Sequence, residues 1–280
     1  MPTRPLLIID GDSFAHRAFH AVPKTVRRAG NKGGNAIVGF ANYLIRLYEA
    51  ERPRAVLVGW DTLEVPNWRA KEFPDYQGGR EFDDEIVEQL GVLPQFIAAC
   101  GFVSGKAAGY EADDFLAAAV EAEEKAGGTA LVASGDRDAF QLASEQTTIL
   151  HPVKAGEIAR IGPTEVRERY GVEPAQVPDF IALRGDPSDK IPGARGVGAV
   201  TAASLLKRHP DLESMLADNR FPGQEEALRL YKRLATMGRD TPLAPVKDAT
   251  PTWDKAADLA RQWELRALSE RLDGLAKATA

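Results

Sequence analysis

The sequence predicts an α/β fold, with a parallel sheet in the first part of the chain and a helical region after it. Short apolar runs alternate with segments of helical period up to about residue 170, and this alternation is typical of a parallel sheet. Beyond residue 170 no strand pattern remains. With 280 residues, 44% of them hydrophobic, the chain is long enough for one large and one smaller domain.

Four short apolar runs are the predicted strands. They are LLIID (6–10), AVLVGWD (55–61), ALVASGD (130–136) and the less regular TTIL (147–150). Unbroken apolar runs of this length are typical of strands that are buried on both faces of a sheet. We therefore expect these four runs to form one parallel sheet.

Helices are predicted between and after these strands. Residues 36–51 carry one apolar stripe, and residues 113–127 form a second helix that ends at Gly127. The stripe consists of Ile37, Phe40, Ala41, Leu44, Ile45 and Leu47. Further helices are predicted within 174–185, 196–209, 223–238 and 254–275, and we expect them to form a helical subdomain.

Composition limits the class of protein. The net charge of −6 taken alone argues against a nucleic-acid partner, unless acids and bases gather in separate places. The single cysteine, Cys100, excludes an internal disulfide and lies in an apolar pattern typical of a buried residue. The apolar run before the first acid has only four residues, too few for a signal peptide or a membrane span, so we expect a cytoplasmic protein. The four histidines show no metal-ligand spacing and are expected to be structural or surface residues.

Acidic residues gather where the predicted strands end. Asp10, Asp61 and Asp136 each close a strand, and the carboxyl ends of parallel strands lie at one edge of a sheet. Further acids are Glu111, Asp113 and Asp114 in YEADD, Asp138 in SGDRD, and Asp186 and Asp189 in GDPSD. Taken singly, each stretch is also explained as a turn or a helix cap.

Together these nine acids point to bound cations. So many carboxylates at one edge would repel one another and raise their own pKa values, unless divalent ions reverse the local charge. Because every ligand is oxygen, Mg²⁺ or Mn²⁺ is favoured over zinc, with two or more ions in the site. Paired ions suit phosphodiester hydrolysis. Without nine negative charges the net charge of −6 becomes +3, so the acidic average reflects this site.

A glycine-rich stretch follows the last two acids. In RGDPSDKIPGARGVGAV (184–200), Gly193, Gly196 and Gly198 have a spacing close to that of a phosphate loop. No strand precedes them, which excludes a dinucleotide-binding fold. We expect Gly196 and Gly198 to let the backbone approach a phosphate group, beside the N–H groups of the following helix. A plain loop at a helix start is the alternative.

The motifs, taken as an ordered set, resemble the 5′-nuclease family of flap endonucleases, phage 5′-exonucleases and the N-terminal nuclease domain of bacterial DNA polymerase I. The motifs are IDGDSFAHRAFHA, WD with RAKEFPDYQGGR, GYEADD, SGDRDAFQL and LRGDPSDKIPGARGVG. The resemblance implies a PIN-like nuclease core in 1–170 with a helical arch at about 70–95. It implies a helical DNA-binding subdomain in 171–280, with a helix–three-turn–helix of helix-hairpin-helix type at about 180–210. No polymerase-like segment follows, so we expect a stand-alone form.

The resemblance also implies roles for individual residues. The first metal site corresponds to Asp10, Asp61, Glu111 and Asp113, with Asp114 close by, and the second to Asp136, Asp138, Asp186 and Asp189. In the arch, Arg69 and Lys71 would contact the DNA backbone, Tyr76 would stack on a base, and Arg80 would meet the scissile phosphate. Arg17 would face the 5′ strand, and Lys207 would join Gly196 and Gly198 on the duplex. The alternative for the arch is a mobile, solvated, charged loop.

Two positions depart from the family pattern. Gln77 follows Tyr76 where the family usually has Lys, and Lys190 stands where the family usually has Asn. Neither departure removes a carboxylate. The expected activity is therefore metal-dependent cleavage of DNA with a free 5′ end, a flap or a junction, RNA-primed DNA included. We expect the protein to be a monomer and to have no membrane partner. Two alternatives stay open: a PIN-like ribonuclease that acts mainly on RNA, and a catalytically silent DNA-junction binder.

Overall fold

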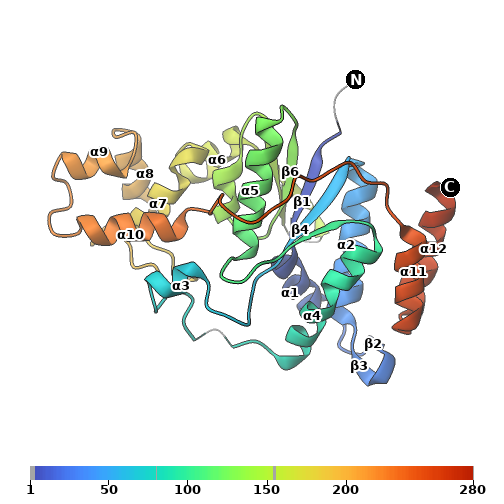
Figure 1. The fold of residues 1–280 in the computed structure, drawn as a ribbon. Coiled ribbons are helices and arrows are strands. Elements are labelled where there is room, and N and C mark those ends of the chain that lie inside the picture. The colour runs from blue at the N-terminus through green and yellow to red at the C-terminus, as the bar shows by residue number, and fades with distance from the viewer. Residues whose placement is uncertain (1–3, 80, 154–155, 280) are drawn as a thin grey trace.

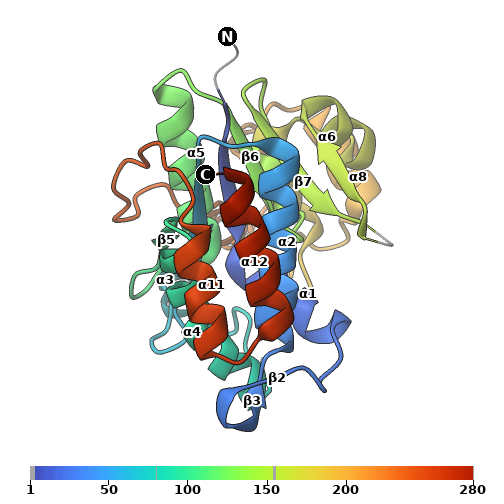
Figure 2. The same ribbon diagram turned by 90° about the vertical axis from the view of Figure 1, so that its right-hand side faces the viewer.

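The computed structural model describes residues 4–79, 81–153 and 156–279, and it consists of a central sheet covered by helices on both faces (Figures 1 and 2). None of the helices in these described residues is long and apolar enough to cross a membrane. The parallel α/β core predicted from the alternating strands and helices is confirmed.

The main sheet has six strands in the order β5-β4-β1-β6-β7-β8, of which only β8 runs antiparallel to its neighbour. Its strands are β1 (Leu6–Asp10), β4 (Ala55–Gly59), β5 (Val103–Gly105), β6 (Ala130–Ala133), β7 (Thr147–Pro152) and β8 (Ile158–Ile161). The two strands not predicted, β5 and β8, are the edge strands. Both are short, and only one residue in each is buried, so neither has the continuous apolar run of a central strand.

Helices make up most of the remaining chain. Before β7 they are α1 (Gly11–Ala21), η1 (Ala29–Asn31), α2 (Asn35–Glu51), α3 (Trp68–Glu72), α4 (Asp84–Ala99), α5 (Ala112–Lys125) and η2 (Asp138–Leu142). After β8 they are α6 (Pro163–Tyr170), η4 (Pro174–Gln176), α7 (Val177–Arg184), α8 (Ala199–Leu206), α9 (Leu212–Ala217), α10 (Glu225–Ala235), α11 (Trp253–Gln262) and α12 (Arg266–Thr279). A two-stranded ribbon, β2 (Arg27–Arg28) with β3 (Lys32–Gly33), lies between α1 and α2.

Alternate residues of the central strands enter two separate hydrophobic cores. Leu6 and Ile8 of β1 belong to the core formed with α5 and with α6 to α10, whereas Leu7 and Ile9 belong to the core formed with α1, α2, α4, α11 and α12. The period-2 alternation of side chains in a strand requires this division. The predicted stripe of α2 lies wholly in the second core, and Cys100 is buried there as expected.

The last two helices lie on the sheet domain and not beside α7–α10. α11 packs against α4 and α12 packs against α2, as Figure 2 shows. A segment without helix or strand, residues 236–252, leads back from α10 to this face of the molecule. The expected boundary at residue 170 stays a prediction, but α11 and α12 share the core of residues 6–102.

The expected arch is helical only at its ends. α3 and α4 flank the turns of residues 74–79, where Gln77 has φ 51° and Gly79 has φ 76°. These left-handed values exclude a continuous helix through Gln77, although the resemblance implied a helical arch at about 70–95. Arg80 itself lies outside the described residues.

Candidate active site

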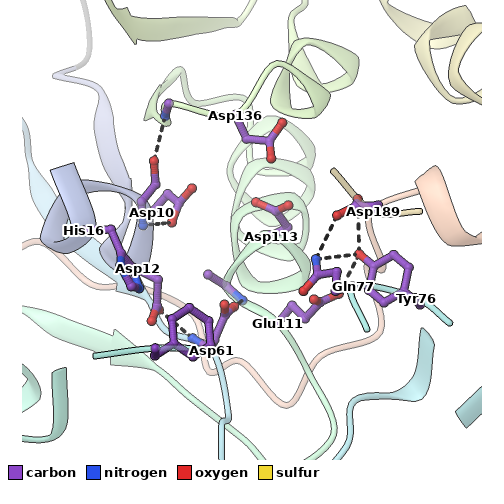
Figure 3. A pocket seen from close by; sticks show the side chains of 14 residues that line it. Asp10, Asp12, His16, Asp61, Tyr76, Gln77, Glu111, Asp113, Asp136 and Asp189 are labelled. Atoms are coloured by element: carbon purple, nitrogen blue, oxygen red, sulfur yellow. Dashed lines mark hydrogen bonds between the residues drawn. The ribbon is translucent and has the colours of Figure 1, made fainter. Parts of the chain in front are cut away.

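An acidic cavity of about 280 Å³ opens at the carboxyl ends of β1, β4 and β6 (Figure 3). Seven carboxylates line it: Asp10, Asp12, Asp61, Glu111, Asp113, Asp136 and Asp189. Asp10, Asp12 and Asp61 lie on one side, facing Gln77, Tyr76 and Asp189 across the cavity. Six of these seven were predicted from the sequence, three because parallel strands end at one edge of the sheet and three from the acidic motifs YEADD and GDPSD.

Two of the carboxylates also hold helix N-termini. Asp10 accepts a hydrogen bond from the backbone N–H of Ser13 (2.9 Å) and thereby caps α1. Asp61 accepts one from the backbone N–H of Ala112 (2.7 Å) at the start of α5. Asp10 and Asp61 thus hold helix N-termini and line the cavity at the same time. The positive ends of both helix dipoles offset part of their negative charge.

Burial and mutual repulsion raise the pKa values of four of these carboxylates. Burial, together with the charges of Asp61 and Asp136, raises the pKa of Asp10 to about 7. Burial also raises the pKa of Glu111 to about 7, although Arg69 acts in the opposite direction. The pKa values of Asp12 and Asp113 are raised well above their ordinary value by burial and by neighbouring carboxylates.

The donor set fits a hard divalent cation. Every candidate ligand is a carboxylate oxygen, and raised pKa values mark a place where added positive charge would be stabilised. Within residues 4–79, 81–153 and 156–279, no three acidic, histidine or cysteine side chains lie close enough to hold one ion together. Ligation would therefore need these side chains to move inward, and the assignment of ions to residues stays a prediction.

A second acidic group adjoins the cavity. The pKa of Asp138 is raised well above its ordinary value by burial and by Asp136, Asp189 and Asp186. Asp186 is held by the backbone N–H of Ser188 (2.8 Å) and by Arg184 (3.1 Å). The four acids expected in the second metal site are thus neighbours, although only Asp136 and Asp189 line the cavity.

Asp114 and Arg69 differ from expectation. Asp114 is fully buried and pairs with Arg69 (2.8 Å), which also pairs with Glu111 (2.6 Å). Arg69 donates further to the backbone carbonyls of Leu234 and Thr236. Because Arg69 is only 3% exposed, it joins α3, α5 and the end of α10 inside the protein and has no surface to offer a DNA backbone.

Tyr76 also differs from expectation. Its side chain is buried, and its hydroxyl lies 3.3 Å from Glu111 Oε2 and 3.4 Å from Asp189 Oδ2. Burial and these two carboxylates raise the pKa of Tyr76. The ring therefore cannot stack on a base in this conformation, and the hydroxyl instead joins the two acidic groups.

Sequence reasoning missed Asp12 and His16. Asp12 lines the cavity and accepts a hydrogen bond from the backbone N–H of Asp61 (2.8 Å). The D-x-D spacing of Asp10 and Asp12 repeats that of Asp136 and Asp138, so the signal was present in the sequence. His16 lines the same cavity beside Phe82, and it has no spacing pattern that could have identified it.

The chain matches two family descriptions in succession. Residues 5–171 match "5'-3' exonuclease, N-terminal resolvase-like domain", and residues 172–257 match "5'-3' exonuclease, C-terminal SAM fold". The chain belongs to the 5′-3′ exonuclease family.

The curated relatives include DNA polymerase I of Mycobacterium bovis, which is 37% identical over 98% of this chain and 32% of that protein. Thermostable DNA polymerase I of Thermus thermophilus is 33% identical over 97% of this chain and 32% of that protein. The chain thus spans about a third of the length of these relatives.

Solved structures share the fold of this 5′-3′ exonuclease family member. The T5 D15 protein co-crystallised with metal ions has a TM-score of 0.69 at 16% identity, over 98% of this chain and 100% of that one. The catalytic core of Rad2 in complex with DNA substrate has a TM-score of 0.64 at 13% identity, over 97% and 90%. At such identities the likeness concerns the fold.

The remaining predicted residues of this exonuclease-family chain lie on the surface. Arg17, Lys71 and Lys207 are exposed, so each has the access that a DNA contact needs. Gly196 and Gly198 lie just before α8, with open space where a side chain would stand. Their contact with a phosphate stays a prediction.

Proposed function

We propose that this chain is a divalent-metal-dependent 5′-nuclease that cleaves DNA bearing a free 5′ end, a flap or a junction. The observation that carries the proposal is the acidic cavity at the carboxyl edge of the sheet, in a chain of the 5′-3′ exonuclease family. Seven carboxylates around one opening would repel a phosphodiester unless cations lay between them.

We expect two groups of carboxylates, each of which would hold one ion. Asp10, Asp61, Glu111 and Asp113 would hold one ion, and Asp136, Asp138, Asp186 and Asp189 another. When bound, Mg²⁺ or Mn²⁺ would supply an activated water and charge stabilisation for the leaving oxygen. Arg69 neutralises Asp114 and part of Glu111, and so keeps the α5 N-terminus in place beneath the cavity.

A second surface would fix the duplex. The backbone before α8 is open at Gly196 and Gly198, the N-terminus of α8 offers free N–H groups, and Lys207 adds positive charge at its other end. The loop with Asp186 and Asp189 directly precedes this surface in the chain. A duplex held there would bring a phosphate near the cavity at a fixed spacing.

The relatives support the same assignment. The T5 D15 protein was crystallised with metal ions, and the Rad2 core with DNA substrate. Both properties agree with the carboxylate set and support the proposal that this chain is a metal-dependent enzyme acting on DNA.

Cleavage of matched DNA and RNA flaps tests the proposal. The wild type should cut a 5′-flap DNA in Mg²⁺ and not in EDTA, and Asp136→Asn/Asp138→Asn should abolish cleavage while DNA binding stays equal or tightens. A matched control is Asp254→Asn/Asp258→Asn on α11, which removes two exposed acids far from the cavity and should cut normally.

Each alternative has its own outcome. Cleavage of the RNA flap alone would identify a ribonuclease. Tight binding of the junction without any cleavage in Mg²⁺ or Mn²⁺ would identify a silent binder. A double variant that cuts at near the wild-type rate would show that the metal-site assignment is wrong.

A further inference from the structure

The arch turn and the acidic loop of the C-terminal region are joined at the rim of the cavity. Gln77 donates its backbone N–H to the carbonyl of Asp189 (3.3 Å) and its side-chain amide to Asp189 Oδ1 (3.0 Å). The same amide lies 3.2 Å from the Tyr76 hydroxyl. Figure 3 shows these three side chains on one side of the cavity. Gln77 therefore positions residues 186–190 against the turn of residues 75–79.

One residue on each of the two joined segments, Gln77 and Lys190, adopts an unfavourable backbone conformation. Gln77 has φ 51° and Lys190 has φ 57°, in the left-handed region that suits Gly, Asn and Asp better than long side chains. Strained residues of this kind persist where the surrounding structure holds them, and they concentrate at functional sites. The strain at Lys190 suggests that a lysine is used here for its charge.

The ammonium of Lys190 lies over the arch turn. A methyl group added to Gly78 would stand 3.5 Å from Lys190 Nζ, and one added to Gly79 would stand 3.9 Å away. Lys190 is exposed, and no ion pair joins it to a carboxylate in the part of the chain that the structure describes. An exposed ammonium group thus stands next to the turn that carries Gln77, at the edge of an acidic cavity.

The two departures from the family pattern occur on these facing segments. An amide replaces the expected lysine at residue 77, and a lysine replaces the expected asparagine at residue 190. The rim has therefore lost one ammonium on the arch side and gained one on the loop side. Because Lys190 Nζ reaches back over Gly78, the positive charge remains close to the turn.

We propose that Lys190 contacts a phosphate of the DNA strand that enters the cavity, and that Gln77 positions the loop that carries it. The proposal rests on the proposed nuclease function. Lys190 is the phosphate-contacting residue, since an ammonium attracts a phosphodiester at the edge of a cavity that seven carboxylates help to line. Gln77 is a positioning residue that acts through Asp189.

Four variants test the exchange of charge: Lys190→Asn, Lys190→Arg, Gln77→Lys and the double variant Gln77→Lys/Lys190→Asn. Single-turnover cleavage of a 5′-flap DNA in Mg²⁺ should slow about tenfold or more in Lys190→Asn, and Lys190→Arg should stay within about threefold of the wild type. The double variant should recover most of the loss, because it returns a cation to the same rim. Lys255→Asn, an exposed lysine on α11, is the matched control and should cleave normally.

Binding gives a second measurement that does not need cleavage. In EDTA, the slope of log affinity against log salt for the same DNA should fall by about one unit or less in Lys190→Asn and return in the double variant. Asn suits a left-handed φ, so Lys190→Asn should melt at the wild-type temperature or above, which separates a charge effect from unfolding.

A Lys190→Asn variant with normal rate and normal salt slope would overturn the proposal, and so would a double variant as slow as Lys190→Asn. A wild type that leaves every DNA and RNA substrate intact would instead refute the nuclease function. In that case an unchanged salt slope in Lys190→Asn would still count against a phosphate contact, and a reduced slope would still support one.

Discussion

Asp10 has hydrogen-bond donors that favour its charge and neighbours that oppose it. The backbone N–H of Ser13 and the hydroxyl of Ser134 (2.8 Å) both donate to its carboxylate. Burial and two nearby acids outweigh these donors, and its pKa is raised to about 7. Asp10 is thus well held by its hydrogen-bond donors, yet its negative charge is unfavourable in this place without an added cation.

The raised pKa values give the metal-free protein a defined pH dependence. In the folded state Asp10 and Glu111 keep their protons up to about pH 7, whereas in the unfolded chain they lose them near their ordinary values of 3.8 and 4.5. Between these limits the folded state binds more protons, so its free energy of unfolding falls as the pH rises. The melting temperature in EDTA should decrease from pH 5 to pH 7.5, and Mg²⁺ should restore it most at the upper end. A melting temperature that stays level or increases in EDTA would contradict this assignment.

Arg69 should be a stabilising residue and not a DNA contact. Arg69→Met leaves Glu111 and Asp114 as buried, unpaired carboxylates, which should lower the free energy of unfolding by about 3–5 kcal/mol in urea denaturation. Arg229→Met breaks an exposed pair with Glu213 and should change it by about 1 kcal/mol or less. Equal, small effects of both variants would show that the buried cluster is not needed for the fold.

At the level of elements, the acidic loop depends on a close backbone crossing. Gly193 has φ 81°, and a methyl group there would stand 2.5 Å from the backbone nitrogen of Gly185. This crossing brings the end of α7 against residue 193 and closes the loop that carries Asp186 and Asp189. Gly198, by contrast, has φ −99° and open space around it, so the fold itself does not require glycine there.

Substitution of the two glycines should therefore separate folding from binding. Gly193→Ala should lower the free energy of unfolding by about 2 kcal/mol or more, because alanine suffers both the left-handed φ and a backbone overlap. Gly198→Leu should leave thermal stability nearly unchanged but weaken binding to duplex DNA more than to single strands. Equal losses on both kinds of DNA would argue against a duplex contact at the start of α8.

At the level of the whole molecule, the C-terminal segment fastens the two halves of the chain together. Arg54 before β4 pairs with Glu123 of α5 and with Asp248 of the returning segment (3.0 Å). Thr252 then donates hydrogen bonds from its hydroxyl to the carbonyl of Ala99 and from its backbone N–H to the carbonyl of Cys100, at the end of α4. α11 and α12 thereby complete the core on the α2 and α4 face, which a division of the chain at residue 170 does not suggest.

Trp253 provides a test of that closing contact. It is 2% exposed and packs edge-on against Tyr48 and Phe102, with ring centroids 5.3 Å and 5.6 Å away. Trp253→Ala should lower the free energy of unfolding by about 3–5 kcal/mol, whereas Val200→Ala, at a side chain that is 87% exposed, should change it by about 0.5 kcal/mol or less. If Trp253→Ala were as mild as its control, α11 would be only loosely attached to the core.

The sequence by itself determined the parallel sheet, the buried stripe of α2 and the gathering of acids at one sheet edge. These features follow from local regularities: apolar runs with a fixed period, and the rule that parallel strands end together. Six of the seven carboxylates that line the cavity were predicted: Asp10, Asp61 and Asp136 from the strand ends, and Glu111, Asp113 and Asp189 from acidic motifs. Asp12 has the same D-x-D spacing and could have been predicted by the same argument.

Only the tertiary structure decided which charged residues face the cavity and which neutralise one another inside the protein. The residue types of Arg69 and Asp114 and their positions in helices do not distinguish them from exposed charged residues. The packing of α3 on α5 and α10 buries them together. The place of α11 and α12 and the position of Lys190 over Gly78 were decided in the same way. Contacts between residues 100 or more positions apart depend on how whole elements pack. The local periodicity of the sequence carries no information on that packing.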